Sequence, residues 1–316
     1  MPMIVTLTMN STIDKTCEVA QVVAEFKLRC GIPKYYAGGG GINVARAIRR
    51  LNGDAHAIWT QGGPTGQRLQ ELLDREGVKH TPIPVHGQTR ENLIVFESTT
   101  ARHFRFCMPG HELHREELQA CTACLSSIGS APAYLVISGS MPPGLSDDDL
   151  QDLFNSIPSS TRTIVDTSGS AMHQILKRSV YMIKPNLREL EQLAGQSIEN
   201  NEQIRSAART IIQKRQTEIV LTSVGAQGAI LSTEQGHWQF HSPTVKTCCR
   251  VGAGDSMVAG TVVALSQGQP IVEAVRYGVA AGTAAVLTEG TELCGLEDTE
   301  ALFQDMSSED LSHWPL

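Results

Sequence analysis

The sequence lacks long hydrophobic runs and any excess of basic residues. No apolar stretch approaches the roughly 18 uninterrupted residues of a membrane span, and the opening "MPMIVTLTMN" has an apolar run too short for a secretory signal. The net charge is -7, whereas proteins that hold nucleic acid or an anionic membrane surface present a basic face. We therefore expect a cytoplasmic protein with small-molecule ligands and with neither a nucleic-acid nor a membrane partner.

Cysteine is also sparse, with 8 in 316 residues, which is too dilute for a disulfide scaffold. Cys121 and Cys124 have CxxC spacing, so a redox or zinc role is one interpretation. The surrounding "REELQACTACLSSI" has the pattern of an amphipathic helix without a second ligand pair, which favours two small packing residues instead. The neighbours Cys248 and Cys249 cannot readily bond to each other, and we expect both to be reduced.

What the sequence does contain is an alternation of short apolar runs, rich in Val and Ile, with helical patterns. This alternation predicts a mostly parallel sheet covered by helices on both faces, an α/β/α sandwich. The expected strands are 4–8, 56–60, 134–138, 163–166, 181–184 and 218–222. The expected helices are 43–51, 65–76, 115–127, 146–154, 187–194 and 202–214, with further helices from about 256 onward.

Two segments, 14–36 and 88–107, break this rhythm because they alternate polar and apolar residues like half-exposed strands, with a turn-like "STTA" in the second. We predict that they form a small accessory sheet covering a cleft as a lid. The body is then residues 1–13, 37–87 and 108–316. An apolar sheet face in water would be costly, so we expect it to pack on a second subunit and to make a homodimer.

The stretch "RVGAGDSMVAG" at 250–260 is the most specific part of the sequence. Backbone N–H groups of Gly252, Ala253 and Gly254 at a helix start would form an anion pocket. The spacing fits neither a Walker A loop nor a dinucleotide fingerprint. We infer that the anion is a phosphoryl group in transfer, whose charge the amides stabilise while Asp255 removes a proton from the attacking hydroxyl. A helix capped by Asp255, with flexible glycines, is the alternative.

Two further stretches are weaker signals. In "AGGGGINVARAI" (37–48) the glycines allow close approach to a ligand and Asn43 could bind sugar hydroxyls, although a flexible turn before a helix explains the run equally well. In "KPNLRE" (184–189), Asn186 and Glu189 share one helical face, a spacing suited to holding a magnesium–phosphate complex through water. A helix N-terminus with a Glu in its first turn is the alternative there.

Four of the basic residues in the two lid segments are candidates for binding a phosphate, Lys27 and Arg29 in the first segment and Arg90 and Arg105 in the second. Lys27 and Arg29 are expected on the same face of a strand because they are i, i+2 neighbours. In an acidic protein, this positive charge beside the cleft suits a permanent phosphate on the substrate. The alternative is a solvated strand face whose charges prevent edge-to-edge pairing.

Taken together, these stretches resemble the PfkB carbohydrate kinase family of the ribokinase-like fold. "GGGGINVARAIRRLNGDAHAIWTQGG" and "RVGAGDSMVAG" are similar to its two signatures, and "SGSMPPG" (138–144), "KPNLRE" and "TSVGAQGA" (222–229) lie between them in the family's order. The resemblance implies a three-layer α/β/α sandwich with a small β-sheet lid. With "FKLRC", "TREN" and "RFCMPG", it also implies transfer of the γ-phosphoryl of MgATP to the C1 hydroxyl of fructose 6-phosphate, a step of glycolysis.

The resemblance further implies roles for individual residues. Asp255 matches the catalytic base, and Gly252, Ala253 and Gly254 match the anion hole. Positions that hold the sugar hydroxyls are matched by Asp14, Gly39, Gly40, Asn43 and Ser138, and those that grip the sugar phosphate by Arg90, Lys27, Arg29 and Arg105. The nucleotide side is matched by Lys184, Asn186, Glu189, Ser223, Gly225 and Gly228, of which Asn186 and Glu189 organise Mg²⁺ through water. A K⁺ loop is matched by Val251, Ala285 and Gly290.

The chain departs from the family pattern near this K⁺ loop. Cys248, Cys249 and Arg250 stand where small polar residues are expected, and Glu292 stands where a basic residue is expected. Neither departure touches the predicted base.

Three other functions compete with the expected one. A sister activity on fructose 1-phosphate or tagatose 6-phosphate is the nearest, but such relatives tend to carry a lysine where this chain has Gly40. A kinase of an unphosphorylated sugar or nucleoside would leave the four basic lid residues without a phosphate. A catalytically silent sugar-phosphate sensor would be expected to have lost the GAGD or NxxE elements, and both are intact.

Overall fold

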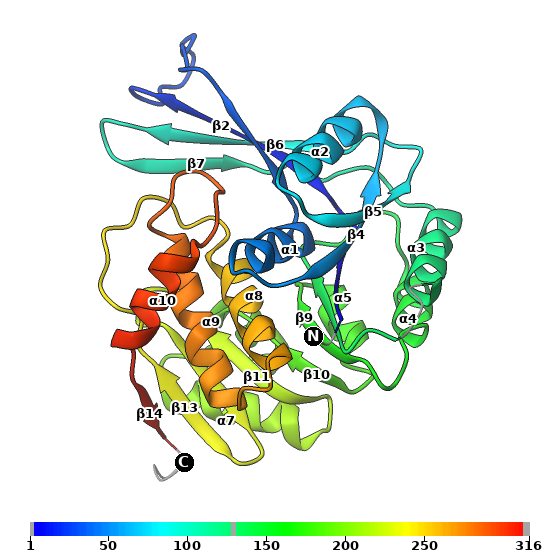
Figure 1. The fold of residues 1–316 in the computed structure, drawn as a ribbon, viewed down its shortest axis with the longest axis vertical. Helices are drawn as coiled ribbons and strands as arrows, with labels where there is room; N and C mark the ends of the chain where they lie inside the picture. Colours follow the sequence, from blue (N-terminus) through cyan, green and yellow to red (C-terminus); the bar gives the residue numbers. More distant parts are fainter. Residues whose placement is uncertain (1–2, 128–130, 312–316) are drawn as a thin grey trace.

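The computed structural model describes residues 3–127 and 131–311, so the first two and last five residues of the predicted body, and 128–130, lie outside the described residues. In the large sheet, β5, β4, β1, β8, β9, β10 and β11 run parallel, and three antiparallel strands are added beside β11 (Figure 1). In spatial order the strands are β5 (Lys79–Pro84), β4 (Ala55–Gln61), β1 (Ile4–Thr8), β8 (Tyr134–Ser138), β9 (Arg162–Asp166), β10 (Val180–Ile183), β11 (Thr217–Ser223), β12 (Ala229–Thr233), β13 (Gly236–Phe240) and β14 (Ser308–Asp310).

Helices cover both faces of this sheet. Because successive residues of a strand point to opposite faces, Ile4 of β1 packs into one core cluster while Val5 and Leu7 pack into the other. The first cluster lies beneath α1 (Gly40–Arg50), α2 (Gly63–Arg75), α8 (Ala253–Ser266), α9 (Ile271–Ala285) and α10 (Leu296–Asp305). The second lies beneath α3 (Arg115–Ser127), α4 (Asp147–Asn155), α5 (Ser170–Ile175), α6 (Leu187–Ala194) and α7 (Asn201–Gln213). The predicted α/β/α sandwich is confirmed.

Several elements were not expected from the sequence. Strand β5, "KHTPIP", carries two prolines and a lysine that hide the strand pattern. Proline is tolerated there because β5 is the edge of the sheet. The antiparallel edge strands, the six-residue α5 and α10 were also missed. Helix α8 begins at Ala253, earlier than expected, which puts Asp255 in its first turn.

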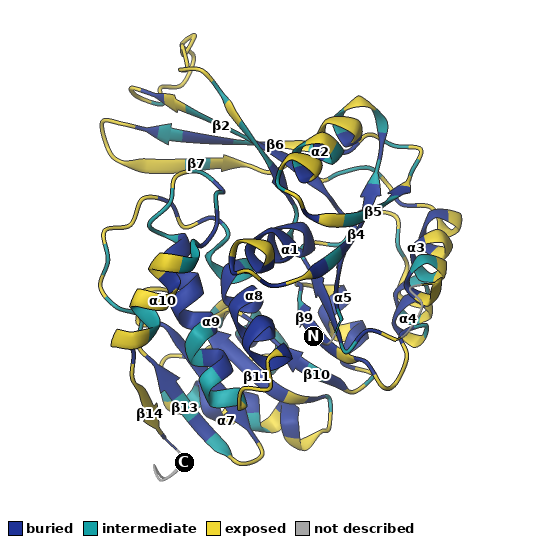
Figure 2. Ribbon diagram, in the orientation of Figure 1, coloured by how far each residue is buried: buried dark blue, intermediate teal, exposed yellow. Residues whose placement is uncertain are grey.

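A separate four-stranded sheet forms the lid in the order β3 (Lys34–Gly38), β2 (Thr12–Val19), β6 (Arg90–Glu97) and β7 (Arg102–Phe106). It projects from the body (Figure 1), and its outer strand β7 is largely exposed (Figure 2). The division of the chain into lid and body segments at the stated residues stays a prediction.

One lid expectation is wrong. Residues 20–33 form no strand, so Lys27 and Arg29 do not share a strand face but lie exposed on a connecting loop. The loop carries Glu25 in the left-handed region at φ 64, and Pro33 lacks the N–H that a paired strand needs. Both features oppose a continuous extended segment between β2 and β3.

Within the described part of the chain, no helix combines the length and the apolar character needed to cross a bilayer.

Candidate active site

The N-terminus of α8 lies at the centre of the candidate site. Its N-cap is Gly252, whose φ of 81 is left-handed and suits a residue without a Cβ. No side chain caps this helix, so Asp255 is not an N-cap and the alternative prediction of a capping aspartate is wrong. The first amides of α8 therefore keep their capacity to bind an anion.

The carboxylate of Asp255 is held from two other elements. Asn43 of α1 donates from Nδ2 to Oδ2 at 3.0 Å, and Ser138, at the end of β8, donates from Oγ to Oδ1 at 3.4 Å. Asn43 and Ser138 are buried, and Asp255 lies among protein atoms while keeping part of its surface accessible from the site. Three predicted residues that are far apart in sequence thus meet at one carboxylate.

The environment raises the pKa of Asp255 to about 6. Burial is the main cause, and the negative charge of Asp166 adds to it. The hydrogen bond from Asn43 and the positive charge of Lys184 act in the opposite direction. A carboxylate with this pKa is a stronger proton acceptor than an ordinary aspartate and is still ionised near neutral pH.

The glycine run lets α1 begin against the end of β8. A Cβ placed on Gly40 would lie 2.3 Å from Ser138 Oγ and 2.4 Å from Gly139 N. Gly39 has φ 106, and a Cβ there would lie 2.7 Å from a methyl group of Thr8. Because the backbones approach this closely, Asn43 is brought within reach of Asp255. The glycines are therefore required for the packing of the site, which a merely flexible turn would not require.

A buried ion pair lies beside the anion pocket. Lys184, which follows β10, places Nζ 3.1 Å from Asp166 Oδ1 at the end of β9. Burial alone would lower the pKa of Lys184, but the charge and hydrogen bond of Asp166 hold it above its usual value. A Cβ on Gly254 would lie 3.3 Å from this Nζ, so the ammonium group is adjacent to the amides at the start of α8.

A second cluster joins the lid to the body. Asp14 of β2 is buried and accepts a hydrogen bond from Asn92 Nδ2 at 3.0 Å. Burial raises the pKa of Asp14, against the hydrogen bond of Asn92 and the charges of Arg105, Arg46 and Arg90. Arg90 donates to Met108 O at 2.6 Å and to Asn10 O at 3.1 Å, while its Nε is buried without a hydrogen-bond partner among the described residues. An anion could take up that remaining donor.

Lys27 and Arg29 are not brought to this cluster within one chain. Both are exposed, and within the described ranges neither takes part in an ion pair.

Three of the predicted nucleotide residues lie together at the end of β11. Asn186 and Ser223 form a parallel β-bridge, and Ser223 and Gly225 share with Asn186 the lining of a cavity of ≈ 390 Å³. Gly228, which has a φ of 98, lies so close to the backbone of β13 that a Cβ on it would be 1.9 Å from Phe240 O.

Asn186 and Glu189 form the capping box of α6. Asn186 Oδ1 accepts from Glu189 N at 2.9 Å, and Glu189 Oε2 accepts from Asn186 N at 2.9 Å. The alternative structural role predicted for this pair, at a helix N-terminus, is therefore present. The capping box uses Oε2 of Glu189 and leaves Oε1 available. This hard oxygen donor fits a water-bridged Mg²⁺.

The candidate K⁺ residues lie at the last residue of α9 (Ala285), just after this helix (Gly290) and just before α8 (Val251). Cys248 N donates to Val286 O at 2.7 Å, which joins the segment before α8 to the end of α9. Val251 and Ala285 are buried, and Gly290 lies against the ring of Tyr36. Beside Gly290, Thr291 Oγ1 is buried with no hydrogen-bond partner in the described part of the chain, so an oxygen donor is available for a cation. Cys249 packs with Ile94 and Val251.

The CxxC pair has the predicted packing position. Cys121 is buried and Cys124 half-buried on α3, both as free thiols. Within the ranges that the structure describes, no group of three or more His, Cys, Asp or Glu side chains is placed to hold a metal ion.

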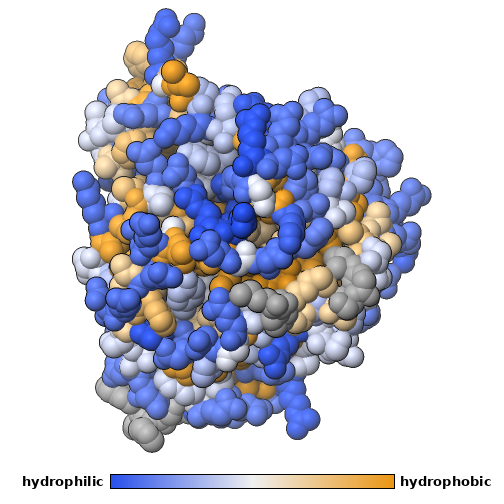
Figure 3. All heavy atoms as spheres, in the orientation of Figure 1, coloured by the Kyte–Doolittle hydropathy of each residue, from blue (hydrophilic) through white to orange (hydrophobic). Residues whose placement is uncertain are grey.

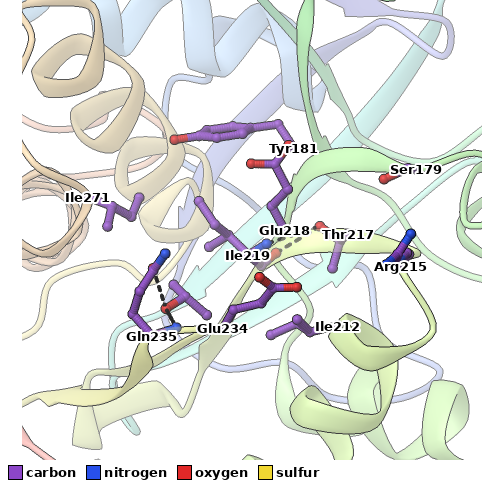
Figure 4. Close-up of a pocket in the computed structure, with 11 residues that line it drawn as sticks. Ser179, Tyr181, Ile212, Arg215, Thr217, Glu218, Ile219, Glu234, Gln235 and Ile271 are labelled. Carbon is purple, nitrogen blue, oxygen red and sulfur yellow. Dashed lines mark hydrogen bonds between the residues drawn. The ribbon is translucent and has the colours of Figure 1, made fainter.

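A larger hollow, of ≈ 480 Å³, is separate from this site (Figure 4). Tyr181, Thr217 and Glu218 line it from the first residues of β10 and β11. Ser138, Asp166 and Lys184 instead stand at or after the last residues of their strands. Since these strands run parallel, the hollow lies at the opposite edge of the sheet and does not belong to the candidate active site.

Sequence reasoning missed several residues of the site. Asp166 was predicted only as a strand residue, although a carboxylate at the end of a buried parallel strand is a recognisable signal. Asn92 was part of the stretch "TREN" but was given no role. Arg46, buried beneath the glycine run, was not singled out either.

Known proteins resemble this chain over nearly its whole length. The model of the pfkB family carbohydrate kinases matches residues 5–299. The ATP-dependent 6-phosphofructokinase isozyme 2 of Mycobacterium tuberculosis (strain ATCC 25618 / H37Rv) is 40% identical over 304 residues, covering 96% of this chain and 89% of that protein. Its namesake in Escherichia coli (strain K12) is 39% identical over 306 residues, covering 96% and 99%.

The fold is similar to solved structures of the E. coli protein. The crystal structure of phosphofructokinase-2 from E. coli in complex with fructose-6-phosphate has a TM-score of 0.91 and 37% identity, and the match covers 96% of this chain and 99% of that one. Another structure of that protein, with a TM-score of 0.92 and 38% identity over the same shares, contains potassium. A third, with a TM-score of 0.91, is described as its tetrameric inhibited form.

Proposed function

The chain belongs to the pfkB family of carbohydrate kinases, and on that premise we propose that it transfers the γ-phosphoryl group of ATP to the C1 hydroxyl of fructose 6-phosphate. The observation that carries this proposal is the position of Asp255, a carboxylate with a raised pKa in the first turn of a helix whose amides are uncapped. Base and anion pocket on the same turn suit a reaction in which a hydroxyl attacks a phosphoryl group.

In this mechanism Asp255 accepts the proton of the C1 hydroxyl as that oxygen attacks the phosphorus. Asn43 and Ser138 hold the carboxylate in place through their hydrogen bonds. The amides of Gly252, Ala253 and Gly254, with the adjacent ammonium of Lys184, stabilise negative charge on the transferring group. The products are fructose 1,6-bisphosphate and ADP.

Cations other than Lys184 complete the nucleotide side. Mg²⁺ bound with ATP supplies neutralisation of phosphate charge, and Asn186 and Glu189 are the residues we assign to hold it through water. K⁺ is assigned to the site around Val251, Ala285 and Gly290, between the end of α9 and the start of α8, with Thr291 Oγ1 as an available oxygen donor. Ser223 and Gly225 are assigned to the nucleotide because they line the cavity at the end of β11. Gly228 is assigned to it because its conformation shapes the turn between β11 and β12.

The sugar is proposed to bind beneath the lid. Asp14 accepts hydrogen bonds from sugar hydroxyls, and Gly39 and Gly40 allow the sugar to approach the backbone closely. Arg90 and Arg105 bind the phosphate that the sugar already carries. Lid closure then excludes water, which would otherwise accept the phosphoryl group.

Lys27 and Arg29 are proposed to join the phosphate grip only in an assembled lid, because both are exposed in the single chain. Their loop also exposes Phe26 (73%) and Ile32 (94%), and hydrophobic atoms are visible on the projecting tip of the lid (Figure 3). We propose that a second copy of the chain covers these side chains, so the active form is a homodimer in the cytoplasm.

The proposal is tested by measuring ADP release with fructose 6-phosphate, fructose 1-phosphate, tagatose 6-phosphate and ribose. We expect a kcat/KM for fructose 6-phosphate at least about tenfold above the others, because one well-placed contact contributes about 1.4 kcal/mol or more. Asp255→Asn serves as the negative control in each assay. A preference for any other acceptor would overturn the named reaction, while an active Asp255→Asn variant would overturn the assignment of the base.

A further inference from the structure

Arg46 is a buried cation directly beneath the active site. It lies on α1, three residues after Asn43, and its side chain is 2% exposed. Its Nη1 donates to three oxygen atoms, Ala37 O at 2.7 Å, Thr291 O at 3.2 Å and Asn43 Oδ1 at 3.4 Å. Its Nε donates to Glu76 Oε2 at 2.7 Å.

Stability alone does not account for an arginine at this position. Desolvating a guanidinium is expensive, and a well-packed apolar residue often stabilises a core as well as a buried ion pair does. The other buried residues of α1 include the apolar Ile42, Val44, Ala45 and Ala47. The apolar side chain of a methionine at position 46 would suit these neighbours. What Arg46 adds is a set of donors fixed in direction.

The direction matters because Asn43 has two unlike ends. Its Nδ2 is a donor and its Oδ1 an acceptor, and only the donor end stabilises a carboxylate. In the structure Nδ2 faces Asp255 and Oδ1 faces Arg46. A guanidinium can only donate, so the reversed amide would place two donors against each other and an oxygen against the carboxylate.

We propose that Arg46 is a positioning residue for the phosphoryl transfer: it fixes the side-chain amide of Asn43 so that its N–H points at Asp255. The same guanidinium links this amide to the carbonyl of Ala37 at the root of the lid and to that of Thr291 beside the candidate K⁺ loop. The proposal rests on the proposed function only in that Asp255 is the base.

Other charged groups also face Asp255 and set the background for a test. Asp166 approaches from β9 and Lys184 from the segment after β10, and Glu189 of α6 acts on Lys184. Arg46 does not contact any of these three through a hydrogen bond or ion pair, so among its contacts the one with Asn43 leads to Asp255. Its replacement also removes a positive charge that lowers the pKa of Asp14.

The experiment measures kcat and KM from pH 5 to 9 for the wild type, Arg46→Met and Arg46→Lys. We expect kcat of Arg46→Met to fall on the order of tenfold with KM values within about twofold. Without the fixed N–H of Asn43, the proton affinity of Asp255 increases, so the low-pH limb of kcat moves to higher pH. Arg46→Lys should lie between, because an ammonium keeps one charge but not the fork geometry.

Arg205→Lys is the matched control. Arg205 is likewise buried, and it donates through Nη1 to Leu311 O from α7, away from Asp255. It should lower Tm as Arg46→Lys does but leave the low-pH limb in place.

A double mutant decides whether Arg46 acts through Asn43. In an Asn43→Ala background the Arg46→Met change should leave the limb where Asn43→Ala alone puts it. A further displacement there, or an unmoved limb in folded Arg46→Met or Arg46→Lys, would overturn the proposal. If Arg46→Met does not fold, Arg46→Lys carries the test. Failure of the proposed function is distinct, since it would appear as a wild type inactive on fructose 6-phosphate or an active Asp255→Asn.

Discussion

At the scale of single residues, the chemistry of the site depends on how neighbours treat one carboxylate. Asp255 receives hydrogen bonds from Asn43 and Ser138 and the positive charge of Lys184, yet burial and Asp166 leave its pKa at about 6. These opposing effects bring the pKa of Asp255 close to neutral pH. A proton acceptor is most effective there because it is ionised and still basic.

The first prediction concerns the pH dependence of this residue. The folded-state pKa of Asp255, about 6, is raised from 3.8, so the carboxylate is protonated and inactive as a base below that pH. We expect kcat/KM to fall as the pH drops through about 6. Asp255→Asn should lower kcat about 10²–10⁴-fold and, having no buried charge at pH 7.5, should melt no lower than the wild type.

Initial-rate measurements across pH, with Tm from thermal denaturation, check both parts. A wild-type profile flat between pH 5 and 7 would contradict the assignment, and so would near-normal turnover of Asp255→Asn.

The second prediction concerns Gly40. A Cβ added at Gly40 would lie 2.3 Å from Ser138 Oγ and 2.4 Å from Gly139 N. Gly40→Ala must therefore push α1 away from β8 and separate Asn43 from Asp255. We expect kcat/KM to fall on the order of 10²-fold, since sub-ångström misplacement in a site is costly, together with a loss of about 1–3 kcal/mol of unfolding free energy.

The matched control is Gly295→Ala at the N-cap of α10, where a Cβ would meet Asp298 Oδ2 at an ordinary 3.6 Å. Steady-state kinetics and urea unfolding compare the two variants. Equal behaviour of both would mean that the close approach at Gly40 is unimportant.

At the scale of elements, α6 serves two purposes with one pair of residues. Its capping box satisfies the first amides of the helix, and the same Asn186 and Glu189 are proposed to organise Mg²⁺. The two roles predict different losses on mutation, because a cap needs an acceptor whereas a cation site also needs negative charge.

The third prediction separates these roles. Glu189→Gln keeps an acceptor for Asn186 N and should change stability by less than about 0.5 kcal/mol, yet it should raise the Mg²⁺ concentration for half-maximal activity several-fold. Asn186→Ala removes the cap and should cost about 1 kcal/mol. Mg²⁺ titrations at fixed ATP, with Tm alongside, distinguish them. An unchanged Mg²⁺ requirement in Glu189→Gln would leave the pair with the capping role alone.

At the scale of the whole molecule, the lid is the part whose apolar side chains a single chain leaves exposed. Its sheet has an exposed outer strand, and its tip presents Phe26 and Ile32 to solvent. Exposed apolar clusters on such a tip are typical of an interface. The cations Lys27 and Arg29 lie on the same loop, so assembly and phosphate binding are expected to be coupled.

The fourth prediction is that Ile32→Asp shifts the protein from dimer to monomer. Placing a charge in a covered apolar contact costs several kcal/mol, and a dimer with a micromolar Kd would dissociate at assay concentration. Light scattering after size exclusion measures the mass, and kinetics should show KM for fructose 6-phosphate raised. Gln196→Asp, which adds the same charge at an exposed position beyond α6, is the control. A dimeric Ile32→Asp would show that the lid tip is not the contact.

The sequence by itself determined the layered architecture and the residue at the centre of the site. Buried parallel strands require short, continuous apolar runs, and helices require a 3.6-residue period, so both patterns can be recognised in a linear chain. The glycines before Asp255 could be recognised for the same reason, because an anion pocket on one turn is built from consecutive residues, although only the structure excluded Asp255 as the cap of the helix.

Only the tertiary structure decided which distant side chains meet that turn. Asn43 lies in α1, Ser138 ends β8 and Lys184 follows β10. Their contacts with Asp255 and Asp166 arise because the ends of parallel strands converge on the start of α8. The role of Arg46 depends on carbonyls of residues 37 and 291, a separation that no local pattern encodes. The loop of Lys27 and Arg29 was misjudged because backbone conformation between paired strands is set by the pairing, whereas alternation describes only side chains.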